Sequence, residues 1–120
     1  MPRVEFVTHK DQRILILDLS ETQNVGESVA AVQAALDVIV KEPPKSVRLL
    51  TDITHSHYTA EGVDVLKRFS KTVTPYMKAS ASVGVLGIRR IIVRSLMALS
   101  GRRIEMFDSR QDALDWLARQ

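Results

Sequence analysis

Several features that often reveal a protein's function are absent from this sequence, and each absence excludes a class of function. There is no cysteine, which excludes disulfide bonds, thiol catalysis and thiolate metal ligands. There is no glycine-rich phosphate-binding loop and no Gly-x-Ser-x-Gly nucleophile motif. No segment approaches the roughly 20 apolar residues of a membrane-spanning helix. The N-terminal segment has no apolar run after Arg3, so we expect a cytoplasmic protein without a signal peptide.

What the sequence does contain is the composition of an ordinary globular domain. Apolar residues make up 45% and charged residues 26% of the 120 residues, which is typical of soluble proteins. A chain of this length can bury roughly two-thirds of its unfolded surface. We therefore predict one domain that spans residues 1–120.

Hydrophobic periodicity predicts that strands and helices alternate along the chain. The expected strands cover residues 3–8, 13–19, 47–53, 83–88 and 102–108, and the expected helices cover residues 24–41, 59–78, 89–99 and the segment after Ser109. The first two strands form a hairpin, and the later alternation implies parallel neighbours with right-handed crossovers. The predicted fold is α/β, in the order ββαβαβαβα, with a mixed, mostly parallel five-stranded sheet and four helices.

Capping and breaking residues define the expected helix ends. Asn24 and Glu27 have the spacing of a capping box, and Ser109 is of a type preferred at the N-cap. Gly101 suits the left-handed residue that often follows a helix. Pro75 should bend or end the second helix, because it removes a backbone donor and clashes with the preceding turn.

The first predicted helix is apolar on more than one side. Its main stripe contains Val29, Val32, Leu36, Ile39 and Val40, and a second side contains Ala30, Ala31, Ala34, Ala35 and Val38. One sheet face cannot cover both sides of a single helix. We therefore expect part of this helix to pack under the N-terminal hairpin or against a second copy, and we predict a homodimer. The third helix has one expected inward face, formed by Ile91, Ile92, Leu96 and Leu99.

The central predicted strand, Val47–Ile53, ends in a polar turn that leads to a helix N-terminus. In open α/β sheets, ligands and partners bind at the carboxyl ends of the strands. We therefore place a candidate ligand or partner surface at this turn. The residues of this surface are His55, His57, Tyr58, Thr59 and Glu61.

The same turn permits two chemical interpretations. Asp52, His55 and His57 are residue types that bind zinc or iron. Ser56, together with His57 and Asp52, supplies the residue types of a catalytic triad, although adjacency in one short turn does not suit the linear triad geometry. A polar loop at a strand end accounts for all of these residues. We therefore predict no enzyme activity, no metal ion and no cofactor.

Basic residues are concentrated between residues 61 and 103. This segment has nine Lys or Arg residues against two acidic residues, a balance of +7, and the rest of the chain has a balance of −4. Arg89 and Arg90 lie near a helix N-terminus, where the macrodipole disfavours positive charge by about 0.3–1 kcal/mol each. We predict that an exposed positive surface from Lys67 to Arg103 meets an acidic protein partner or a small anion. Its residues are Lys67, Arg68 and Lys71 on the second helix and Arg89, Arg90, Arg94, Arg102 and Arg103 on and around the third. A solvated face is the alternative. Nucleic acid is not expected, because no exposed aromatic residues are interleaved for stacking.

The order of elements and the C-terminal residues resemble a known superfamily. The glycine-containing segment Val83–Gly87, an eleven-residue helix and the pattern Phe107-Asp108…Ala113-Leu114…Trp116-Leu117 are similar to the SpoIIAA-like branch of the STAS/SEC14 superfamily. The resemblance covers nearly the whole chain and implies a small, non-enzymatic interaction or ligand-binding domain. In the anti-sigma-factor antagonists of this family, a phosphorylated serine at the start of the second helix switches partner binding.

This sequence departs from the family at two places. Matched on Gly62, the family pattern Asp-Ser-Ser-Gly reads Thr59-Ala60-Glu61-Gly62, so both serine positions are replaced and the serine switch does not carry over. The polar turn after the fourth strand is replaced by Ile88-Arg89-Arg90. We predict a non-catalytic regulatory or protein-interaction module; the alternative is a SEC14-like carrier of a lipid or another small apolar ligand. A carrier needs an apolar internal cavity of roughly a few hundred Å³, whereas an interaction module should be packed solid.

Overall fold

The computed structural model describes residues 2–57 and 59–120. Its sheet has the order β1-β2-β3-β4-β5, with strands β1 (Val4–His9), β2 (Gln12–Asp18), β3 (Val47–Asp52), β4 (Met77–Val83) and β5 (Glu105–Phe107). The helices are α1 (Val25–Ile39), α2 (Ala60–Val73), α3 (Ile88–Ser100) and α4 (Arg110–Ala118), and a 3-10 helix covers Thr74–Tyr76. β1 pairs antiparallel with β2, and the other neighbouring strands are parallel. The predicted order of elements and the mixed sheet are confirmed.

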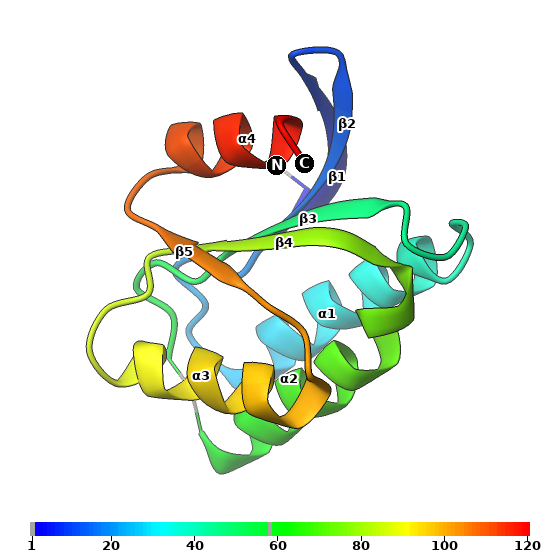
Figure 1. Cartoon of the computed structure of the whole chain (residues 1–120). Helices are drawn as coiled ribbons and strands as arrows, with labels where there is room; N and C mark the ends of the chain where they lie inside the picture. Colours follow the sequence, from blue (N-terminus) through cyan, green and yellow to red (C-terminus); the bar gives the residue numbers. More distant parts are fainter. Residues whose placement is uncertain (1, 58) are drawn as a thin grey trace.

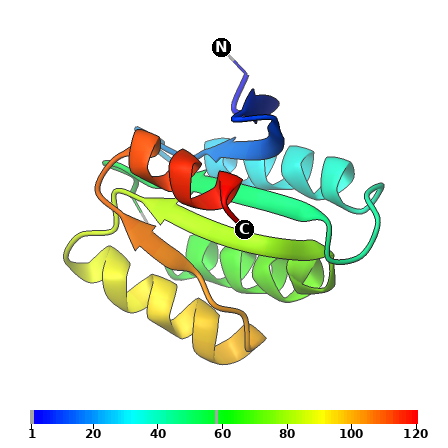
Figure 2. The same ribbon diagram turned by 45° about the horizontal axis from the view of Figure 1, so that its top comes forward.

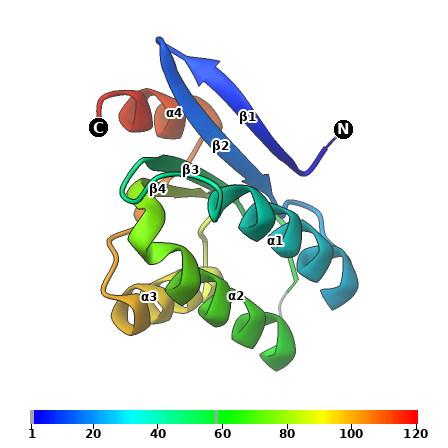
Figure 3. The ribbon, with the colours of Figure 1, turned by 90° about the vertical axis from the view of Figure 1, so that its right-hand side faces the viewer.

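The helices cover the two faces of the sheet unequally. α1, α2 and α3 lie on one face and α4 lies on the other (Figure 1), as the view turned by a right angle also shows (Figure 3). Leu49 belongs to the larger buried cluster, which includes Phe69 and lies under the three helices. Leu50 belongs to the smaller cluster, which includes Leu117 and lies under α4. Adjacent residues of β3 therefore pack alternately into the two clusters, because successive side chains of a strand point to opposite faces of the sheet.

The strand predicted over residues 83–88 is wrong, because the fourth strand is Met77–Val83. The helix predicted to reach residue 78 ends at Val73, since Pro75 cannot donate a backbone hydrogen bond and enters the 3-10 turn instead. The β4 sequence, Met-Lys-Ala-Ser-Ala-Ser-Val, has few of the β-branched and aromatic residues that favour strands. Its small side chains suit a strand that is covered on both faces, and the most deeply buried of them are Ser80, Ala81 and Ser82.

The glycines of the wrongly predicted strand lie in a loop. Gly84 has a φ of +80°, and a Cβ atom at this position would lie 2.3 Å from Thr54 Oγ1. The chain therefore turns sharply after β4 and passes against the end of β3, which only glycine permits. The loop that follows leads directly to α3.

The predicted helix ends are confirmed at four positions. Asn24, Thr59 and Ser109 each accept a backbone N–H of their own helix through a side-chain oxygen. Gly101 adopts a φ of +71° and ends α3. No helix in the described part of the chain is both long and apolar enough to cross a membrane.

The predicted helix faces are only partly correct. In α1, the core side contains Ala31, Val32, Ala35 and Ile39, whereas Val29 and Val40 are exposed. In α3, Val93 and Leu96 are buried, but the predicted inward residues Ile91 and Leu99 are 64% and 52% exposed. Each helix carries apolar residues at helical spacing on two sides, so periodicity alone cannot decide which side meets the sheet.

Candidate functional site

The helices α2 and α3 lie side by side, and their N-terminal ends are at the carboxyl ends of β3 and β4 (Figures 1 and 2). A groove lies between these N-terminal ends. We call it the α2–α3 groove. Its volume is about 470 Å³, and it is lined by Ser56, His57, Thr59, Ala60, Val63, Leu86, Ile88, Arg89 and Ile92. This is the end of the sheet at which open α/β folds bind ligands and partners.

Hydrogen bonds fix the turn that forms one wall of the groove. Ser56 Oγ donates to the carbonyl of Ile53 over 2.6 Å, and Thr59 Oγ1 accepts the Gly62 backbone N–H over 3.1 Å. Both hydroxyls therefore hold the turn and the start of α2 in place. Because Ser56 donates to a main-chain carbonyl rather than to His57, this turn does not have the geometry of a catalytic triad.

The structure brings together only part of the predicted surface. Three of its residues line the groove: His57, Thr59 and Arg89. Three more are exposed on the helices beside it: Glu61, Arg90 and Arg94. His55 lies apart, with its Nδ1 atom 2.8 Å from Glu21 Oε1. Tyr58, which we also predicted, lies outside the described residues.

The residues considered for a metal site do not converge. Asp52 is bound by Arg110 of α4, whereas His55 is bound by Glu21 in the loop between β2 and α1. Within residues 2–57 and 59–120, no three side chains of metal-binding type are grouped closely enough to hold an ion.

Asp52 instead belongs to an ion-pair cluster that sequence reasoning missed. Arg110 Nε donates to Asp52 Oδ2 over 2.7 Å, and Arg110 Nη2 lies 3.3 Å from Asp18 Oδ1. Thr54 donates to Asp52 Oδ1 through both its backbone N–H and its hydroxyl. Burial alone would raise the pKa of Asp52, but the hydrogen bonds from Thr54 and Arg110 lower it overall. The cluster ties the start of α4 to the ends of β2 and β3.

An exposed apolar surface, which sequence reasoning also missed, adjoins the groove. Leu86, Ile88 and Ile91 are 62%, 73% and 64% exposed. Three arginines lie among them on the first turns of α3: Arg89, Arg90 and Arg94. We call these six residues the α3 tip. A signal for this surface exists in the sequence, because apolar and basic residues alternate too closely over 86–94 for one helix face to bury every apolar side chain.

The N-terminus of α3 is suited to negative charge. Its first turn contains two arginines and no acidic residue, while the backbone N–H groups of Arg89 and Arg90 donate to the carbonyls of Leu86 and Gly87. Arg89 Nε is buried and has no hydrogen-bond partner in the described part of the chain.

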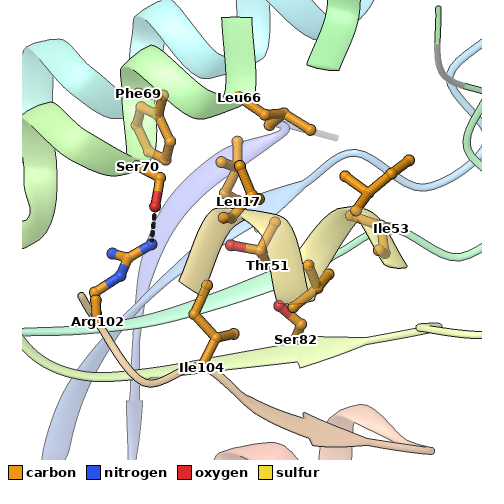
Figure 4. A pocket seen from close by; sticks show the side chains of 12 residues that line it. Leu17, Thr51, Ile53, Leu66, Phe69, Ser70, Ser82, Arg102 and Ile104 are labelled. Carbon is orange, nitrogen blue, oxygen red and sulfur yellow. Dashed lines mark hydrogen bonds between the residues drawn. The ribbon is translucent and has the colours of Figure 1, made fainter. Parts of the chain in front are cut away.

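A second, smaller space lies between α2, α3 and the sheet (Figure 4). Its volume is about 40 Å³, and its walls are Leu17, Ile53, Leu66, Phe69, Ile92, Val93, Leu96 and Ile104, with Thr51, Ser70, Ser82 and Arg102. This volume is far below the few hundred Å³ or so that a lipid carrier requires. We expected Arg102 among the exposed basic residues and in the last strand. It lies before β5 instead, and its Nη2 atom donates to Ser70 Oγ over 2.9 Å.

No family profile and no curated protein sequence matches this chain. Its fold is similar to that of an uncharacterised protein of the DUF3478 family from Shewanella loihica PV-4, whose crystal structure is described as having a SpoIIAA-like fold. The TM-score is 0.65 at 19% sequence identity, and the match covers 95% of this chain and 91% of that chain. The predicted SpoIIAA-like fold is confirmed. At this level of identity the likeness defines the fold and not the activity.

Proposed function

We propose that this SpoIIAA-like chain is a non-catalytic docking module that binds an acidic protein segment in the α2–α3 groove and on the α3 tip. The main support is the exposure of Leu86, Ile88 and Ile91 beside three arginines. Grouped exposed aliphatic side chains mark interaction surfaces. Arginine is favoured at interfaces because its planar guanidinium pairs with carboxylates in a defined geometry.

The groove suits a partner segment that carries one large apolar side chain. Val63 and Ile92 contribute apolar surface from α2 and α3, and the volume of about 470 Å³ is sufficient for such an anchor. Arg89 lies in the same groove with a buried Nε atom that lacks a partner in the described residues. An acidic residue next to the apolar anchor would lie beside the positive charge of the Arg89 guanidinium.

Positive charge extends from the α3 tip along the two helices. Lys67 of α2 borders a shallow depression that also contains Leu99 of α3, and Arg68 and Lys71 are exposed on α2. Each exposed ion pair contributes only ~0–1 kcal/mol, so such charges act mainly on the association rate and its salt dependence. They would steer an acidic partner toward the groove.

Neither catalysis nor lipid transport has comparable support. The titratable groups near the groove are not arranged as a catalytic unit, because the Ser56 hydroxyl is bonded to Ile53 and Asp52 is bonded to Arg110. The space between α2, α3 and the sheet holds only about 40 Å³. A carrier would need these helices to separate widely from the sheet.

The homodimer that we expected from α1 remains a proposal. Ala30 and Ala34 are exposed, and Val29 is 38% exposed. A groove of about 410 Å³ runs between these alanines and the start of β1. A second copy that packed against this face would cover apolar side chains that the sheet leaves in contact with solvent.

Two triple variants with the same change in charge test the proposed docking. One changes the α3 tip (R89E/R90E/R94E), and the control changes exposed residues near the amino ends of the strands (K41E/K78E/R119E). The probes are fluorescent peptides that combine Asp or Glu with Leu, and fluorescence anisotropy at low salt gives the affinity. We expect binding at least about tenfold weaker for the tip variant and unchanged for the control.

Equal peptide binding by wild type and both variants would contradict the proposal. Vesicles of anionic lipid form a separate arm of the experiment. Capture by such vesicles without any binding to the acidic peptides would contradict a protein partner and favour a membrane surface.

A further inference from the structure

Arg102 is a partly buried cation, and no carboxylate in the described residues pairs with its guanidinium. Its Nη2 atom donates to Ser70 Oγ over 2.9 Å, and Ser70 is itself only 2% exposed. Its Nε and Nη1 atoms are inaccessible to solvent and have no hydrogen-bond partner in residues 2–57 and 59–120. No acidic side chain in the same residues lies within ion-pair distance of the guanidinium, although neighbouring Arg103 pairs with Glu105.

The positive charge persists at neutral pH. Burial lowers the pKa of Arg102 to about 10, which still leaves the guanidinium protonated. An ion without a partner in the protein interior is strongly disfavoured, and buried charges are normally paired or bound to a ligand. The fold therefore maintains an unused anion-binding group.

A cavity adjoins this group. Arg102 and Ser70 lie at one end of the space between α2, α3 and the sheet, and Thr51 and Ser82 add hydroxyls to its walls (Figure 4). The remaining walls are apolar and include Leu17, Leu66, Phe69 and Ile104. A water molecule would satisfy donors there but would not neutralise the charge. The combination of one cation with apolar walls favours an anion that has an apolar end.

We propose that this cavity binds a small monocarboxylate of the size of formate or acetate. Its carboxylate pairs with the Arg102 guanidinium and accepts from the hydroxyls beside it, and its carbon end contacts the apolar walls. The volume sets the size of the ligand: about 40 Å³ corresponds to roughly three water-sized atoms at about 10–15 Å³ each. A carboxylate group has three such atoms, so formate fits directly and acetate with a small adjustment of α3. A fatty acid does not fit.

Calorimetry with acetate and formate tests the site. Wild-type protein is titrated at neutral pH with sodium formate, sodium acetate and, at equal ionic strength, sodium chloride. We expect saturable binding of the carboxylates with a Kd of roughly millimolar or tighter, together with a saturable rise in Tm, because the ligand binds the folded state. Sodium chloride should produce neither effect.

Two variants and one control locate the binding. R102M removes the cation at similar side-chain length, and S82V fills the cavity while it leaves Arg102 in place; both should abolish carboxylate binding. R103M changes the adjacent arginine, whose side chain is 83% exposed, and should bind as the wild type does. If R102M does not fold, S82V alone decides the question.

The proposal is overturned if the wild type shows no saturable carboxylate binding up to about 50 mM. It is also overturned if a folded R102M or S82V variant binds as tightly as the wild type. An equal effect of chloride would assign a halide site rather than a carboxylate site.

Discussion

Replacement of Asp52 by Asn should destabilise the fold by about 2 kcal/mol. Asp52 is 6% exposed and accepts from Arg110 Nε over 2.7 Å. An asparagine that keeps the Thr54 hydrogen bonds through Oδ1 turns its NH₂ group toward the guanidinium, so that two donors face each other. Removing one partner of a fully buried pair costs about 3–5 kcal/mol. The Arg110 side chain is 40% exposed, and solvent screening therefore lowers the expected loss.

Thermal and urea denaturation of the wild type and its variants measures this interaction. D52N should lower Tm by roughly 6–12 °C. The wild type, D52N, R110M and the double variant form a double-mutant cycle, which should give a coupling energy of about 1 kcal/mol between Asp52 and Arg110. R103Q serves as the control, because its pair with Glu105 is largely exposed, and it should change the free energy of unfolding by less than ~0.5 kcal/mol.

The same cluster predicts a pH dependence. The folded-state pKa of Asp52 is lowered, so its contribution to stability is complete above the pKa of an unfolded aspartate, about 3.9, and is lost as the pH falls through the folded-state value. The difference in stability between wild type and D52N should therefore shrink in acid. A difference below ~0.5 kcal/mol at neutral pH, or a coupling energy near zero, would refute the reasoning.

Three further predictions concern separate parts of the chain. G84A should lower the free energy of unfolding by about 2 kcal/mol or more, because residue 84 has a φ of +80° and the new Cβ would collide with Thr54. The control G101A, at a φ of +71° in open space, should lower the free energy of unfolding by only about 1 kcal/mol in the same denaturation experiment. Sedimentation at tens of micromolar should show a dimer that A34E converts to a monomer, and a monomeric wild type would contradict this use of α1. Mass spectrometry of protein from its native cell should find no stoichiometric phosphate in residues 56–62, because both family serines are replaced, and such phosphate would contradict the loss of the serine switch.

Local signals in the sequence predicted four helix ends, at Asn24, Thr59, Gly101 and Ser109, but placed the end of α2 beyond Val73. Asn24, Thr59, Ser109 and Gly101 act through their own side chains or backbone conformation, so their effect does not depend on the rest of the fold. β4 was predicted in the wrong place for the opposite reason. Its alanines and serines have weak strand preference, and they form a strand because the surrounding elements cover both of its faces.

The candidate site was only partly predictable, because its residues meet through the fold. The turn after β3 was placed correctly, since the strand carboxyl ends follow from the order of elements. The pairing of Asp52 with Arg110 joins residues 58 positions apart. The exposure of Ile91 and the burial of Arg102 depend on how α3 is rotated against α2 and the sheet, and the periodicity of α3 does not specify that rotation.

The most direct measurement of the docking surface is an NMR titration of isotope-labelled protein with an acidic, leucine-containing peptide. We predict that the backbone amide signals with the largest shifts belong to residues of the α2–α3 groove and the α3 tip, including His57, Thr59, Leu86 and Arg89. Signals around Lys41 and Arg119 should not move. Shifts that are spread evenly over all exposed basic residues, or centred on α1 or α4, would contradict the account.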